Sequence, residues 1–238
     1  MVILMTIIVS VKRDDWLVMI ADTRGTIKKE KKVSERTFEK MFKIKGYDCV
    51  IGYTGEDDEI FEFHNELSDE IEKKGPKDAQ EIITIADNIR KQSFKKYQLV
   101  GYIIGSVNSE KKIIVESHKS GILVKTGKTL SDETFIITGI PEELASNMEY
   151  LEDKEIELLD WASKIVLFVT DKIRDIGIEE KCGTQSTLRW VVLTSNGVVY
   201  DLYLNFYSPF DSSIDFGSVS LVKDTKFEHT FLRNLKKI

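Results

Sequence analysis

Cysteine and proline are scarce in this chain of 238 residues, which has two of the first and three of the second. The cysteines, Cys49 and Cys182, are too few and too far apart for a disulfide scaffold, so we expect a reducing, cytoplasmic setting. Long apolar runs are also missing, because no stretch approaches the roughly 18 residues that a membrane-spanning helix needs. Residues 1–5 are apolar but lack the basic segment of a secretory signal. We therefore expect no membrane partner.

No block of basic residues stands out either. The chain has 34 basic and 40 acidic residues mixed along its length, with a net charge of -6. This balance argues against a nucleic-acid partner bound mainly by electrostatics. The three histidines, His64, His118 and His229, lack a metal-ligand spacing such as His-Glu-x-x-His. We therefore expect no metal site and no cofactor.

Apolar residues make up 42% of the chain, enough for a sizeable core, and their spacing predicts the elements. The expected strands cover residues 6–12, 16–22, 40–44, 49–53, 99–106, 113–117, 122–124, 134–138, 188–194 and 198–204. Residues 25–34 are expected to form an exposed loop or an edge hairpin. Helices are expected after residue 54, with Thr54 as N-cap, after residue 77, over 141–151 and over 155–174.

The elements alternate in blocks: strands, two helices, strands, two helices, strands. Hairpin strands and paired helices favour an α+β fold in which two antiparallel sheets pack together, with a helix layer outside each, a four-layer αββα sandwich. No proline-rich or Gly/Ser-rich linker interrupts the chain. We therefore expect one domain over residues 6–205, with residues 206–238 as a C-terminal extension packed on it.

The first two expected strands bring a hydroxyl residue toward an acid and a base. A threonine hydroxyl is a poor nucleophile and needs a base. If Thr6 becomes the first residue, its own α-amine can serve, because the ordinary pKa of that amine leaves much of it neutral near neutral pH. The positive charge of Lys40 would favour proton loss from the amine or hydroxyl, and Asp22 would hold that lysine in place. Arg24 would add a second positive charge.

This pattern resembles the start of a proteasome β subunit or its bacterial HslV-type relative, which are N-terminal-nucleophile hydrolases with an αββα sandwich. The likeness is specific over roughly the first 60 residues and architectural beyond them. The residues that carry it are Thr6-Ile7-Ile8-Val9-Ser10-Val11, Ala21-Asp22-Thr23-Arg24, Lys40-Met41-Phe42-Lys43-Ile44 and Ile51-Gly52-Tyr53-Thr54-Gly55.

The resemblance implies a threonine peptidase that cleaves amide bonds of a peptide or protein through an acyl-Thr6 intermediate. It implies that Asp22 and Lys40 complete the catalytic set and that the Gly55 N–H binds the substrate oxyanion. Glu179 and Cys182 stand where the family has a supporting acid and serine. The resemblance also implies a homo-oligomer in the form of a ring, with an ATPase partner.

The chain departs from the family at its beginning. Residues 1–5 precede Thr6 and are interpreted as a possible propeptide or upstream extension, removed by processing or bypassed by translation from Met5. The supporting serine that the family places near Gly139 is missing. Two other interpretations stay open: an amidase of the same fold acting on a small amide, and a catalytically silent structural homologue with an unprocessed N-terminus. Taken alone, Asp22 with Arg24 could be a surface ion pair, and Cys182 a small buried residue.

Overall fold

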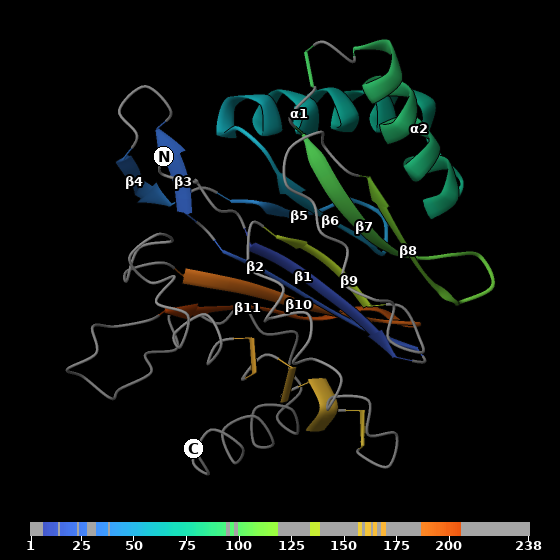
Figure 1. Ribbon diagram of the computed structural model, residues 1–238. Helices are drawn as coiled ribbons and strands as arrows, with labels where there is room; N and C mark the ends of the chain where they lie inside the picture. Colours follow the sequence, from blue (N-terminus) through green and yellow to red (C-terminus); the bar gives the residue numbers. More distant parts are fainter. Residues whose placement is uncertain are drawn as a thin grey trace.

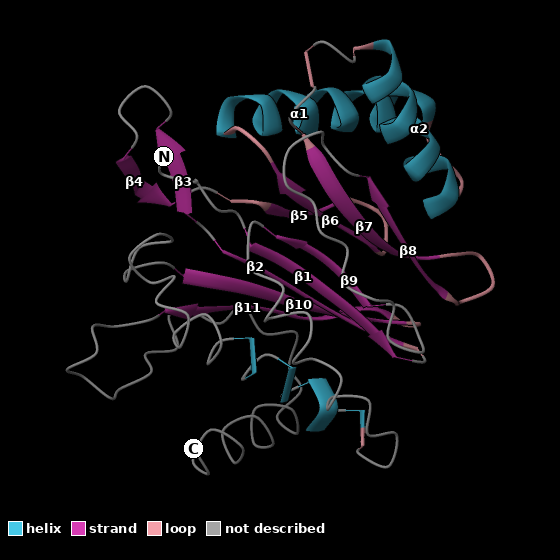
Figure 2. Cartoon of the chain, in the orientation of Figure 1, coloured by secondary structure: helices cyan, strands magenta, loops and turns pink. Residues whose placement is uncertain are grey.

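The computed structural model describes residues 7–13, 15–22, 24–27, 32–37, 39–93, 96–97, 100–118, 134–138, 157–158, 160–162, 164–165, 168–169 and 187–205. Over these residues the chain is α+β, with two larger antiparallel sheets, a two-stranded hairpin and a pair of long helices (Figures 1 and 2). The expected elements at 122–124 and 141–151 and the extension over 206–238 lie outside the described residues.

The first sheet contains the two opening strands at its centre. Its order is β11-β10-β2-β1-β9, and all its pairs are antiparallel. The strands are β1 (Ile7–Arg13), β2 (Trp16–Asp22), β9 (Thr134–Thr138), β10 (Thr187–Thr194) and β11 (Gly197–Asn205). The predicted tight turn between the last two strands is confirmed, since Gly197 follows Ser195 and Asn196 with φ 101°.

The second sheet has the order β5-β6-β7-β8 and carries the two long helices on one face. Its strands are β5 (Met41–Lys43), β6 (Cys49–Thr54), β7 (Gly101–Val107) and β8 (Ile113–His118). Helices α1 (Asp57–Lys74) and α2 (Ala79–Gln92) lie on the side of this sheet that faces away from the first sheet (Figure 1). As predicted, α1 buries a stripe at helical spacing: Ile60, Phe63, Leu67 and Ile71.

Successive side chains along β6 and β7 point alternately into two different hydrophobic cores. Ile51 and Tyr53 pack with the helix stripe, whereas Val50 and Ile103 pack with residues of the first sheet. The core between the sheets also contains Ile8, Leu17, Met19, Ala21, Val191 and Leu193. The two sheets approach closely at Gly105, where an added Cβ would lie 2.2 Å from Leu17 Cδ2. The two sheets therefore pack face to face.

The start of α1 differs from the prediction. Thr54 was expected to cap the helix, but it is the last residue of β6 and pairs with Gly101. Strand pairing extends through Thr54, so the helix cannot begin until the chain has turned at Gly55. The N-cap is Glu56, whose side chain makes no capping hydrogen bond.

The lysine-rich segment after β2 is a hairpin rather than a loop. Strands β3 (Arg24–Ile27) and β4 (Lys32–Thr37) pair antiparallel in a sheet of their own. In the sequence, the hairpin lies between Asp22, at the end of β2 in the first sheet, and Lys40, just before β5 in the second sheet. It therefore connects the segments that carry two of the predicted site residues.

The last expected helix is described only in part. Residues 158, 160–162, 164–165 and 168–169 are helical, and Ala162, Ile165 and Val169 from the predicted stripe are buried. The guanidinium of Arg13 in β1 lies 5.7 Å from the ring centroid of Trp161, which links this segment to the first sheet. No helix among the described residues has the length and apolar character needed to cross a membrane.

Candidate active site

The site is built around a buried ion pair between the ends of two strands. Asp22 is the last residue of β2, and Lys40 directly precedes β5. Lys40 Nζ donates to Asp22 Oδ2 over 2.7 Å, and the two residues are only 2% and 1% exposed. The structure thus brings together two of the three predicted catalytic residues, 18 positions apart in the sequence.

The backbone of Lys40 is held by the second sheet. Its carbonyl oxygen accepts a hydrogen bond of 2.7 Å from the N–H of Tyr53 in β6. The following residue, Met41, is opposite Gly52 in the β5–β6 pair. Because both the main chain and the ammonium are anchored, the positive charge has a fixed place between the two sheets.

Burial makes this pair energetically demanding. Two charges removed from water lose hydration, and their attraction offsets that loss only when the geometry is good. Breaking such a pair by deleting one partner costs about 3–5 kcal/mol, because the other charge stays buried. Lys40 is therefore a buried residue of the pair and not a solvated strand residue. Because a buried ion pair adds little net stability, we treat this one as the centre of a candidate functional site.

Gly55 lies at the same end of the second sheet as Lys40. Lys40 is bonded to Tyr53, and Gly55 follows Tyr53 by two residues at the end of β6. Its φ of 140° lies in a region that side chains rarely adopt, and the residue is exposed. A glycine is therefore needed at this turn, and an exposed backbone is open to a ligand.

The remaining predicted residues are less fully placed. Arg24 opens β3, two positions after Asp22, but only its backbone is described. Thr6, Glu179 and Cys182 lie outside the described residues. The described strand β1 begins at Ile7, directly after Thr6, and Ile8 is opposite Ala21 in β2. The start of β1 and the end of β2 therefore lie at the same end of the first sheet.

Aromatic side chains support the segment after Lys40. The rings of Phe42 and His64 stack with centroids 4.0 Å apart, and Tyr53 Oη lies 3.1 Å from His64 Nδ1. Burial lowers the pKa of His64 to about 4 and raises that of Tyr53 well above its ordinary value. Both groups are therefore neutral near neutral pH, and this side of the site carries no charge of its own.

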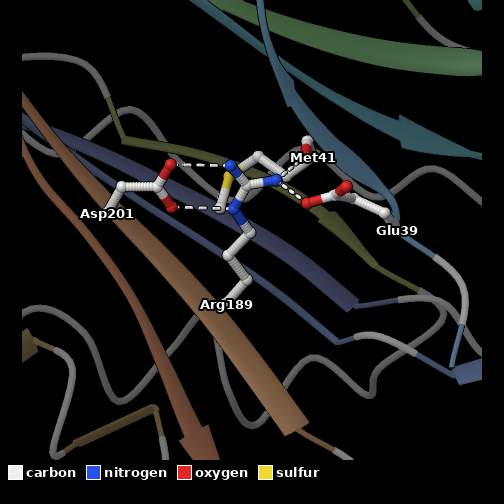
Figure 3. Close-up of polar contacts among 4 residues, drawn as sticks. All are labelled: Glu39, Met41, Arg189 and Asp201. Carbon is white, nitrogen blue, oxygen red and sulfur yellow. Dashed lines mark hydrogen bonds and ion pairs between the residues drawn. The ribbon is translucent and has the colours of Figure 1, made fainter. Parts of the chain in front are cut away.

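Sequence reasoning missed one charged residue beside the site, Arg189. Its guanidinium lies between the carboxylate of Asp201 on one side and Glu39 with the Met41 carbonyl on the other (Figure 3). The sequence did contain one indication of this role: Arg189 lies within the apolar run of β10, and a charge buried in such a strand needs partners.

Among the described residues, no group of three or more His, Cys, Asp or Glu side chains could hold a metal ion. The described site therefore offers a fixed ammonium, a carboxylate and an accessible glycine turn. No model of a known protein family matches the chain, and no curated protein matches it significantly.

Proposed function

We propose that this chain is a threonine-type N-terminal-nucleophile hydrolase that cleaves amide bonds of peptides. The observation that carries the proposal is the buried Asp22–Lys40 pair, because a permanently held ammonium is what a weak hydroxyl nucleophile needs nearby. Strand β1 starts one residue after Thr6, at the end of the sheet where Asp22 lies. The described start of β1 therefore lies at the end of the sheet that carries the proposed support.

The reaction is acyl transfer. The α-amine of a Thr6 exposed by loss of residues 1–5 accepts the hydroxyl proton while Oγ attacks the substrate carbonyl carbon. The oxyanion that forms accepts a hydrogen bond from the Gly55 N–H, a contribution of about 3–4 kcal/mol to transition-state stability. Collapse expels the amine with a proton from the α-amine, leaving an ester on Thr6. Water then hydrolyses this ester by the reverse sequence of proton transfers.

The same proposal extends to the architecture, a four-layer αββα sandwich. Its support is the burial of the first-sheet face that points away from the second sheet. Val18, Ile20 and Trp190 on that face are at most 1% exposed, although their neighbours Leu17, Met19 and Val191 pack between the sheets. A second helix layer over that face, including the helical residues around Trp161, accounts for this burial.

The resemblance also extends the proposal to a homo-oligomeric ring with an ATPase partner. A ring would hide the sites of a protease from folded proteins. Native mass spectrometry of the purified chain tests the assembly: a closed ring supports it, and a stable monomer at micromolar concentration removes it.

Hydrolysis of fluorogenic peptides tests the function. The chain is produced as a fusion whose cleavage leaves Thr6 as the first residue, and we expect it to be active. Thr6→Ala and Lys40→Ala should abolish activity, whereas Lys112→Ala, which removes an exposed lysine, should not. Activity that survives Thr6→Ala would contradict the proposal and direct attention to Cys182. Hydrolysis of small amides alone would favour an amidase, and complete inactivity a silent homologue.

A further inference from the structure

Arg189 holds both chain neighbours of Lys40. From β10, its Nη1 donates to the carboxylate of Glu39 and to the main-chain carbonyl oxygen of Met41 (Figure 3). These two residues directly precede and follow Lys40 in the sequence. The guanidinium therefore grips the main-chain segment from which the proposed catalytic lysine projects.

The other edge of the same guanidinium is fixed by β11. Nε and Nη2 of Arg189 donate to the two carboxylate oxygens of Asp201 over 2.8 and 2.7 Å. Such a bidentate pair sets the plane of the guanidinium as well as its position. Lysine could not replace it, because an ammonium lacks the planar fork that reaches three partners at once.

Arg189 also lies beside the acidic half of the ion pair. In the pairing of β10 with β2, Arg189 is opposite Ala21 and Leu188 is opposite Asp22. One buried side chain, 8% exposed, thus extends from the strand next to Asp22 to the segment that carries Lys40. It connects the first sheet to the second at the end where the site lies.

We propose that Arg189 is a positioning residue: by holding Glu39 and Met41 against the first sheet, it places Lys40 Nζ at Asp22. Its effect on placement stands on geometry alone. Its effect on turnover rests on the proposed function. A merely stabilising bridge would hold the sheets together without governing where the lysine ammonium lies.

Chemical footprinting of Lys40 tests the placement without requiring activity. The folded chain is treated with an amine-acylating reagent, and the acylation rate of each lysine is read by peptide mass spectrometry. We expect Arg189→Met to raise the rate at Lys40 by at least about tenfold, because the segment opens locally. Arg189→Lys should give only partial protection. The exposed Lys112 should react at an unchanged rate in every variant.

Arg90→Met is the matched control. Arg90 is as deeply buried, at 6% exposed, but lies on α2 and contacts neither half of the ion pair through any described hydrogen bond. We expect it to leave Lys40 protected. If Arg90→Met exposes Lys40 as much as Arg189→Met does, or if Arg189→Met leaves it protected, the inference is overturned.

Kinetics then separate this inference from the proposed function. In an active chain, Arg189→Met should lower kcat at least about tenfold with KM nearly unchanged, and should move the acidic limb of the pH profile to higher pH. The shift follows because a displaced ammonium no longer disfavours protonation of the Thr6 amine. If the chain is active but Arg189→Met changes neither kcat nor the pH profile, the positioning role is refuted and the proposed hydrolase function still stands. If the wild type is inactive but the acylation of Lys40 depends on Arg189, the proposed hydrolase function is refuted and the placement of Lys40 by Arg189 still stands.

Discussion

Removal of both partners of the Asp22–Lys40 pair should destabilise the protein less than the two single removals add up to. The two atoms are 2.7 Å apart and the residues are 1% and 2% exposed, so neither charge can regain its hydration when the other is removed. We expect Lys40→Met and Asp22→Asn each to lower the free energy of unfolding by about 3–5 kcal/mol. The double variant should be more stable than the sum of the single effects by about 2–3 kcal/mol, because it leaves no uncompensated charge.

Urea unfolding followed by tryptophan fluorescence, at one fixed protein concentration, measures these free energies. The matched control is the exposed pair of Lys112 with Glu110, at 2.9 Å, for which we expect no measurable coupling because water screens both charges. The reasoning is refuted if the coupling between Lys40 and Asp22 is as small as that of the exposed pair. That result would mean that water reaches the site and that the ammonium is not held.

Three further expectations follow from groups near the site. Burial lowers the pKa of His64 from 6.5 to about 4, so the imidazole resists protonation in the folded protein. The free energy of unfolding should therefore fall as the pH is lowered from 6.5 toward 4, by about 2 kcal/mol after allowance for partial exposure. Urea titrations of His64→Gln should lack this loss. Cys49 is fully buried with its pKa raised to about 12, so its thiol should resist iodoacetamide in the folded protein and react rapidly in urea; rapid alkylation of the native chain would contradict its burial. Gly105→Ala should cost about 1–3 kcal/mol, because its Cβ would lie 2.2 Å from Leu17 Cδ2, and Leu17→Val should recover part of the loss in thermal unfolding; an unchanged Tm would contradict the close approach of the sheets.

Local patterns predicted most of the elements. The stripe from Ile60 to Ile71 has a period of 3.6 residues, and the Ser195-Asn196-Gly197 turn determines where β10 ends and β11 begins. Both are signals between near neighbours in the sequence. The helix start was misplaced because Thr54 has the chemistry of an N-cap, while its strand partner Gly101 is 47 positions away and invisible to a local pattern.

Only those site residues that belong to a recognisable sequence motif could be predicted. Asp22 and Lys40 were predicted from the chemistry that a threonine nucleophile needs and from a resemblance, whereas their burial and contact depend on how the two sheets face each other. The role of Arg189 was not predicted because its partners Glu39 and Met41 come from a segment about 150 positions earlier, and no spacing rule relates the two segments. A buried charge within an apolar strand showed that a partner was needed but could not indicate which one.

The most direct test of the central claim is the intact mass of the chain after treatment with a peptide epoxyketone. This probe reacts only when a threonine offers both its hydroxyl and a free α-amine. The account predicts that the labelled chain begins at Thr6 and carries the adduct there, while chain that still begins at Met1 stays unlabelled. An active preparation in which every molecule retains Met1 would contradict it, because the proposed base would then be absent during turnover.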